Sequence, residues 1–162
     1  MREFDISTLG EAEERGRSES VAAAAVHSDP NVTPTETGPL PGALKKRPAS
    51  PAEWAYRRII LYIAKFEETL DSEHEAAMGF TNGGTGMMRI EGVGHFDPDI
   101  LTFYGTDPAG GRVQLIQHVS QLSVMLRAIP KPREIGEPRR VGFRLVSTLE
   151  DEEEGDTGSD AG

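Results

Sequence analysis

The stretch that decides the fold is GMMRIEGVGHFDPDILTFYGTDPAGGRVQLIQHVSQLSVMLRAI, residues 86–129. Within it, short runs of alternating apolar and polar residues are separated by Gly, Pro and Asp at close intervals. An apolar period of two, interrupted by turn-forming residues, indicates consecutive antiparallel strands. With one more strand just before this stretch, the predicted strands are 75–80, 87–96, 100–104, 113–118 and 122–129.

A helix is predicted directly before the strands. Ser50-Pro51-Ala52-Glu53 combines an N-cap serine, proline at the first helical position and glutamate at the third. The serine can accept a hydrogen bond from the Glu53 N–H, and proline sits where an N–H would be unpaired anyway. Apolar residues then recur at helical spacing to about Leu70, and others lie on the flanks: Ala55, Ile59, Ile63, Phe66 and Leu70, flanked by Trp54, Ile60 and Leu61. This surface is wider than one small sheet covers, which suggests contact with a second subunit or with the N-terminal arm.

One helix followed by five short strands predicts a mainly β fold, a small, strongly bent five-stranded barrel. Alternation along the second strand places Ile90, Gly92, Gly94 and Phe96 on one face. Glycines on an inner face favour the sharp bending that a barrel corner needs. Phe96 is therefore expected in the core beside Ile90, although it could instead stack on a nucleic-acid base.

The rest of the chain divides by composition. Residues 1–49 hold five prolines among Ser, Thr, Gly and Glu, which predicts a disordered arm before the helix-and-barrel domain at 50–130. Residues 131–149 form a basic connector, in which 139–149 alternate and could add an edge strand or contact the barrel loosely. Residues 150–162 carry seven acidic and no basic side chains, which predicts an acidic disordered tail.

Several function classes are disfavoured. The 162 residues include no cysteine, which excludes disulfides and thiol chemistry. No apolar run approaches the roughly 18 residues of a transmembrane helix, and the charged N-terminus lacks a secretory signal, so a cytoplasmic location is expected. The histidines are dispersed and the serines lack a nucleophile-elbow motif. We therefore expect a protein that is not an enzyme and has no metal or cofactor.

The predicted domain resembles the Sm-like fold in its bacterial Hfq form, over roughly residues 51–130. Gly92, Phe96 and Asp97 match the glycine and the Phe-Asp end of that family's second strand, and Ile116-Gln117-His118-Val119 stands where the family has Tyr-Lys-His-Ala. Gln117 thus replaces a lysine, the glycine-to-Phe-Asp spacing is one residue shorter, and the hairpin after Tyr104 is longer. The resemblance implies a ring-forming homo-oligomer that binds RNA at a central pore.

The chain also resembles a group of small uncharacterised bacterial proteins that share the stretches FDPDILTFYG and QLIQHVSQLSVML. That second resemblance implies no known activity.

Six residues are candidates for binding nucleic acid. The Sm-like resemblance places His118 at the turn facing the pore, where it can donate to a phosphate or a base edge, or else it satisfies a carbonyl at the strand end. Gln117 can read base edges or can be an ordinary polar residue on a wet strand face. Phe96 is the third, and the basic cluster of residues 127–144 supplies the others: Arg127, Arg139 and Arg140. That cluster could equally be a solvated connector neutralised by the acidic tail.

The net charge of −10 does not exclude RNA, because the charge is segregated. Residues 51–149 hold 12 acidic and 11 basic side chains, so the predicted domain is nearly neutral.

Our first hypothesis is a non-enzymatic, Hfq-like oligomer that binds RNA, with an acidic tail that competes for the basic cluster. The alternative is a protein-interaction or scaffold module that binds a partner through its helix face or tails and binds no nucleic acid.

Overall fold

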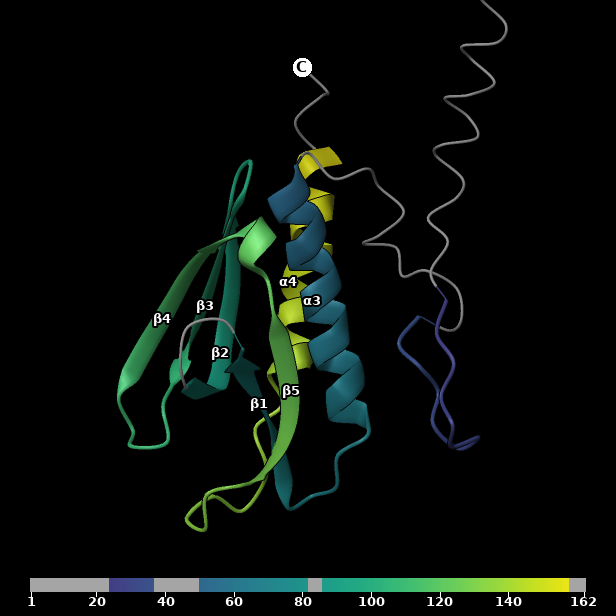
Figure 1. Cartoon of the computed structure of the whole chain (residues 1–162), viewed down its shortest axis with the longest axis vertical. Helices are drawn as coiled ribbons and strands as arrows, with labels where there is room; N and C mark the ends of the chain where they lie inside the picture. Colours follow the sequence, from purple (N-terminus) through teal and green to yellow (C-terminus); the bar gives the residue numbers. More distant parts are fainter. Residues whose placement is uncertain (1–23, 37–49, 82–85, 158–162) are drawn as a thin grey trace, which may run out of the picture. The chain divides into compact units, whose positions relative to one another are not determined.

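The computed structural model describes residues 24–36, 50–81 and 86–157. The chain divides into two compact units, Met1–Pro39 and Leu40–Gly162 (Figure 1). In the first unit, the described residues 24–36 contain a turn at Asp29, whose carboxylate accepts a hydrogen bond from the Asn31 N–H at 2.9 Å. Most of residues 1–49, where the sequence predicts a disordered arm, lies outside the described residues.

The second unit holds one five-stranded antiparallel sheet and two long helices. Its elements, in chain order, are α3 (Pro51–Glu68), β1 (His74–Phe80), β2 (Gly86–Phe96), β3 (Ile100–Thr106), β4 (Arg112–His118), the 3-10 turn η1 (Val119–Gln121), β5 (Val124–Pro130) and α4 (Val141–Thr157). The strand order is β4-β3-β2-β1-β5. The mainly β fold, its N-terminal helix and all five predicted strands are confirmed.

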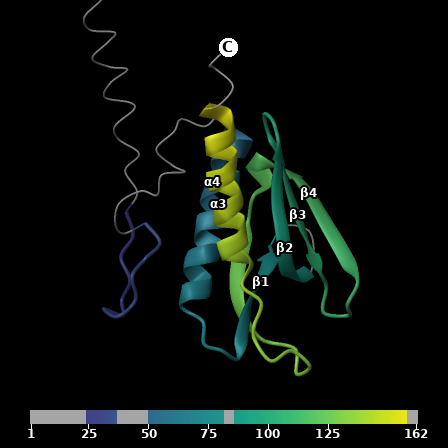
Figure 2. The ribbon, with the colours of Figure 1, turned by 180° about the vertical axis from the view of Figure 1, so that it is seen from behind.

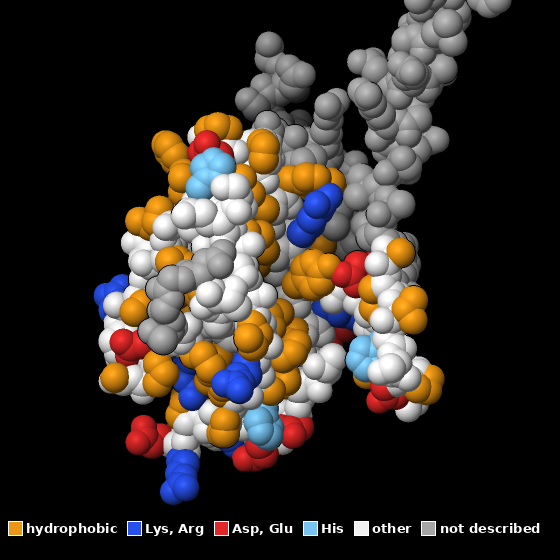
Figure 3. Space-filling model, viewed as in Figure 1, with side chains coloured by type: hydrophobic (Ala, Val, Ile, Leu, Met, Phe, Trp, Pro, Cys, Tyr) orange, Lys and Arg blue, Asp and Glu red, His pale blue; other side chains and the backbone are white. Residues whose placement is uncertain are grey.

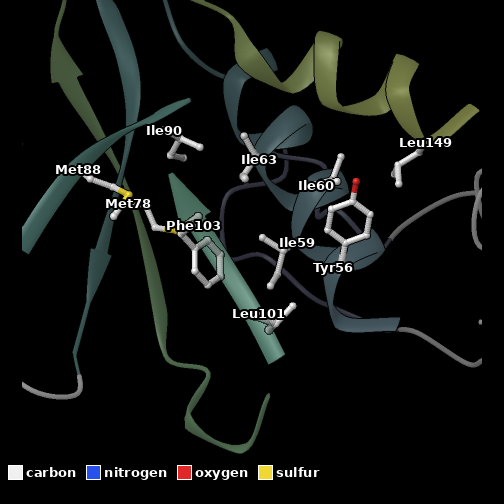
Figure 4. Close-up of a cluster of buried hydrophobic side chains, with 10 residues drawn as sticks. All are labelled: Tyr56, Ile59, Ile60, Ile63, Met78, Met88, Ile90, Leu101, Phe103 and Leu149. Carbon is white, nitrogen blue, oxygen red and sulfur yellow. The ribbon is translucent and has the colours of Figure 1, made fainter. Parts of the chain in front are cut away.

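Both helices lie side by side on the same side of the sheet (Figures 1 and 2). The apolar core is formed between these two layers (Figure 4). Its completely buried members include Met78 and Phe103 from the sheet, Ile60 and Ile63 from α3, and Leu149 from α4. The opposite face of the sheet has no helix over it in the described part of the unit.

The start of α3 forms as the sequence predicts. Ser50 is the N-cap, its Oγ accepts a hydrogen bond from the Glu53 N–H at 3.0 Å, and Pro51 opens the helix. The apolar surface of α3 is wider than the sheet alone covers. Ile60, which lies on the flank of the predicted apolar face, is also completely buried. Figure 4 shows Leu149 of α4 beside Ile60, so a second helix of the same chain covers part of this apolar surface.

The end of the connector and the start of the acidic tail form a helix that the sequence does not predict. Residues 141–157 form the helix α4, so residues 139–149 add no edge strand and residues 150–157 are helical; residues 158–162 lie outside the described part. The residues Val141, Leu145, Val146 and Leu149, which pack in or against the core, recur at helical spacing. Phe143, which alternates with Val141 and Leu145 in the sequence, is 77% exposed.

Glu67 and Gly142 hold α4 against α3. The Glu67 carboxylate accepts hydrogen bonds from the backbone N–H groups of Val141 (3.0 Å) and Gly142 (2.8 Å), which lie in the first turn of α4. Free N–H groups at a helix start favour such an acceptor. A Cβ atom at Gly142 would lie 2.5 Å from the Ala64 Cα, so only glycine allows the helices to approach this closely.

A β-bulge in β2 corrects the predicted faces of that strand. Ile90 pairs with Gly105 but Gly92 pairs with Tyr104, so Glu91 is an extra residue that has no partner on β3. An extra residue shifts the following side chains to the other face. Phe96 therefore does not share the core face with Ile90, and it is 75% exposed.

The sheet is unclosed. Its edge strands are β4 and β5, which η1 connects, and no ladder joins them in the described residues. Closure into a barrel, as the sequence resemblance suggests, is therefore not observed.

Candidate interaction surface

The uncovered face of β2, β3 and β4 gathers exposed apolar side chains. Across the three strands, Phe96 lies opposite Ile100 and Ile100 lies opposite His118. Tyr104 and Ile116 belong to the same face and are 43% and 63% exposed. We call this surface the outer aromatic face, defined by Phe96, Ile100, Tyr104, Ile116 and His118. Exposed apolar side chains gathered on one face are typical of an interaction site.

Two glycines of β2 lie beside Thr102 and Tyr104 of β3. A Cβ atom at Gly92 would lie 3.5 Å from the Tyr104 Cδ2, which is an ordinary van der Waals contact, whereas one at Gly94 would lie 2.6 Å from the Thr102 Oγ1. Gly94 is therefore the position where the close approach of β3 requires glycine. The glycines that the sequence suggested as bending positions in the core thus lie beneath the outer aromatic face.

His118 ends β4 and caps η1. The Ser120 N–H donates to its Nδ1 at 3.1 Å, so Nδ1 is an acceptor and the ring proton of the neutral tautomer is on Nε2. Nε2 lies 3.2 Å from the Asp99 Oδ2, across the hairpin. The histidine therefore has a structural role at the strand end, although its side chain remains 46% exposed.

Asp99, His118 and Ser120 lie in a hydrogen-bonded row that resembles a Ser-His-Asp catalytic triad, since the Ser120 Oγ lies 2.7 Å from the His118 Nδ1. Acyl transfer also needs free N–H donors for the developing oxyanion. In this turn the Ser120 N–H is bonded to His118, and the N–H groups of Val119 and Leu122 donate to backbone carbonyls. The row is thus better explained as the internal bonding of η1 than as a catalytic site.

Gln117 lies on the other face of β4. It pairs with Leu101, which is completely buried, so its side chain faces the core side of the sheet. Its Nε2 is buried and has no hydrogen-bond partner in the described residues. The structure therefore separates Gln117 from His118, its neighbour in the candidate site.

A second polar cluster joins the β2–β3 hairpin to the start of α3. The ring of His95 packs on that of Tyr56 with centroids 4.7 Å apart, and its Nδ1 lies 2.9 Å from the Asp97 Oδ1. The Ser50 hydroxyl donates to the same oxygen, and this bond, aided by His95, lowers the pKa of Asp97. Burial raises the pKa of Tyr56 to about 12. The cluster fixes the hairpin that carries Phe96.

The three candidate arginines do not form one basic surface with His118. Arg140 donates from its guanidinium to the backbone carbonyls of His74 (2.7 Å) and Asp71 (2.8 Å), which ties it to the chain just before and at the start of β1. Arg139 is exposed near the same end. Arg127 lies on β5, beyond β1 and β2 in the sheet. Of the predicted site residues, only Phe96 and His118 are brought together.

The sequence model of a family of unknown function, DUF6173, matches residues 52–144. The chain belongs to this family. The match runs from the first turn of α3 to the first turn of α4, so it includes the whole sheet, η1 and Gly142 but not the acidic half of α4.

No curated protein and no solved structure matches the chain. The comparisons give no support to the Sm-like resemblance, which stays a prediction. In the described residues, no helix is long and apolar enough to cross a membrane, and no three His, Cys, Asp or Glu side chains are grouped to hold a metal ion.

Proposed function

We propose that this protein is a non-enzymatic module that assembles with copies of itself, pairing the β4 edge of one copy with the β5 edge of the next. The unclosed sheet carries this proposal, because β4 pairs only with β3 and β5 only with β1 in the described residues, so the outer side of each edge strand is unpaired. The free N–H and C=O groups of an edge strand are a template for pairing with another chain. Since the two edges are different strands, the contact is head-to-tail and closes into a ring if its rotation permits.

The side chains along both edges support this pairing. Val113 and Leu115 of β4 and Leu126 of β5 pack against the core but are only partly buried. On the outer face, Ile116 and Met125 are 63% and 53% exposed. Fully burying such a side chain contributes roughly 1.5–3 kcal/mol, so covering both edges would favour association.

Light scattering on mixed variants tests the assembly. We expect Ile116→Lys to block the β4 edge and Met125→Lys to block the β5 edge, so each variant alone has the mass of one chain. An equimolar mixture should form dimers and nothing larger, because each copy supplies one intact edge and the two lysine edges repel. Phe143→Lys changes an exposed residue of α4 and should keep the wild-type mass.

A wild-type protein that stays monomeric at every concentration would refute the assembly. So would a mixture of the two variants that remains monomeric.

A second candidate function is binding of single-stranded RNA on the outer aromatic face, for which the exposure of Phe96 and Tyr104 is the supporting observation. Stacking of a base on such a ring contributes about 1–3 kcal/mol. Arg112 lies at the exposed start of β4, and the His118 side chain on this face is 46% exposed. The helix α4 lies on the opposite side of the sheet from this face.

Fluorescence anisotropy with a labelled mixed-sequence RNA tests this second function. Phe96→Ala and Tyr104→Ala should each weaken binding by about tenfold or more, since each removes a stacking ring. Phe143→Ala removes an exposed ring from α4 and should leave the affinity unchanged. No binding by the wild type, or equal losses in all three variants, would reject RNA and favour the protein-interaction alternative.

A further inference from the structure

A pocket of about 510 Å³ lies at the end of β1, apart from the outer aromatic face. It forms between the ends of β1, β2 and β5, and Pro108 of the β3–β4 hairpin contributes to its wall. Gly79 pairs with Met87 on β2 and with Met125 on β5, so a residue without a side chain lies between two methionines. This register leaves a hollow with a glycine floor and apolar walls.

The side chain of Arg127 gives this pocket a positive charge. In the neighbouring row of the sheet, Ala77 pairs with Arg89 on one side and with Arg127 on the other. Arg89 forms an ion pair with Glu75. Arg127 forms no ion pair in the described part of the chain, and its Nη1 donates to the Met87 Sδ at 3.4 Å. An uncompensated positive charge therefore lies at the rim of an apolar hollow. Figure 3 shows hydrophobic and basic side chains lying together on the face of this unit seen in that view.

We propose that the pocket binds a small apolar carboxylate, a flexible hydrocarbon chain with one terminal carboxyl group. Methionine side chains are unbranched and flexible, so Met87 and Met125 can adapt to such a chain. The guanidinium of Arg127 matches a carboxylate in charge and in its paired donors. The volume lies in the range usual for small-ligand sites, which combine apolar walls with a few polar groups.

The charge complementarity selects the ligand class. An uncharged chain gains the same apolar contacts but leaves Arg127 without a partner, and a cationic chain is repelled by it. The proposal does not depend on assembly, since the residues that carry it belong to one chain.

Titration calorimetry with octanoate, octanol and octylammonium on the full chain tests the pocket. We expect octanoate to bind most tightly and octylammonium not at all. Arg127→Gln should weaken the binding of octanoate by more than about tenfold, as expected for a lost charged hydrogen bond. The affinity for octanol should stay unchanged. Arg112→Gln removes an exposed arginine that does not line the pocket, so it should bind like the wild type. Gly79→Leu should fill the floor of the pocket and abolish the binding of both octanoate and octanol.

Three results would overturn the proposal. These are failure of the wild type to bind octanoate, equal affinity for octanoate and octanol, and equal losses in Arg127→Gln and Arg112→Gln. The ligand comparison uses the wild type, so it decides the question even if Gly79→Leu does not fold. Repeating the titration on Ile116→Lys separates failure of the pocket from failure of assembly.

Discussion

At the scale of single residues, Gly142 decides how closely the two helices pack. In Gly142→Ala, the new Cβ would lie 2.5 Å from the Ala64 Cα and 2.9 Å from its backbone nitrogen, so the helices must move apart. Overpacking of this kind costs about 1–3 kcal/mol, which urea unfolding measures. Gly136→Ala is the matched control, because a Cβ there meets nothing within 4 Å. Equal stability of the two variants would contradict this account of the helix contact.

Asp97 makes the stability of the hairpin contact depend on pH. Its pKa is lowered in the folded protein, mainly by the Ser50 hydroxyl. A carboxylate with a lowered pKa binds its proton less readily in the folded state, so its contribution is present above its ordinary pKa of 3.8 and is lost as the pH falls through the folded value. We therefore expect Asp97→Asn to be less stable than the wild type at about pH 7, with the difference shrinking as the pH falls below 3.8.

Urea unfolding of both proteins across this pH range measures the effect. Asp107→Asn changes a carboxylate of the β3–β4 hairpin and serves as the comparison. A stability difference for Asp97→Asn that is constant with pH would show that the carboxylate charge has no part in it.

At the scale of elements, local signals were sufficient for α3 and the five strands. The start of α3 depends on residues that are adjacent in sequence, Ser50 to Glu53, and the strands on alternation between turn residues. The helix α4 was missed because Val141 and Leu145 fit both a strand and a helix pattern. Val146 and Leu149 were the available signal for a helix, but the hydrogen bonds that hold its first turn come from Glu67, far back in the chain.

The bulge in β2 also prevented the sequence from showing which residues share the outer aromatic face, because it too depends on contacts between segments distant in sequence. The extra residue Glu91 is defined by pairing with β3, which alternation within one strand does not reveal. Phe96 and His118 were therefore found as residues but not as neighbours on one face. Tyr104 and Ile116 were missed, because the sequence does not show which face of β3 and β4 the helices cover. The contacts of Arg140 were not predicted, because its partners are backbone carbonyls distant in sequence.

At the scale of the whole unit, the two helices cover only one face of the sheet. This leaves three features for interaction, the two free strand edges, the outer aromatic face and the pocket at Arg127. The edges share Ile116 with the outer aromatic face and Met125 with the pocket. Residues 150–162 carry seven acidic and no basic side chains, whereas residues 51–149 hold 12 acidic and 11 basic ones and are close to neutral. A nearly neutral module with apolar edges suits self-association better than long-range attraction of a polyanion.

Amide hydrogen exchange of the wild-type protein tests whether the β4 and β5 edges pair between copies. We expect the outward-facing amides of both strands to be protected at high protein concentration, and this protection to be lost in both strands together on dilution and in Ile116→Lys. Edge amides that exchange equally fast at every concentration, or protection that persists in Ile116→Lys, would contradict it.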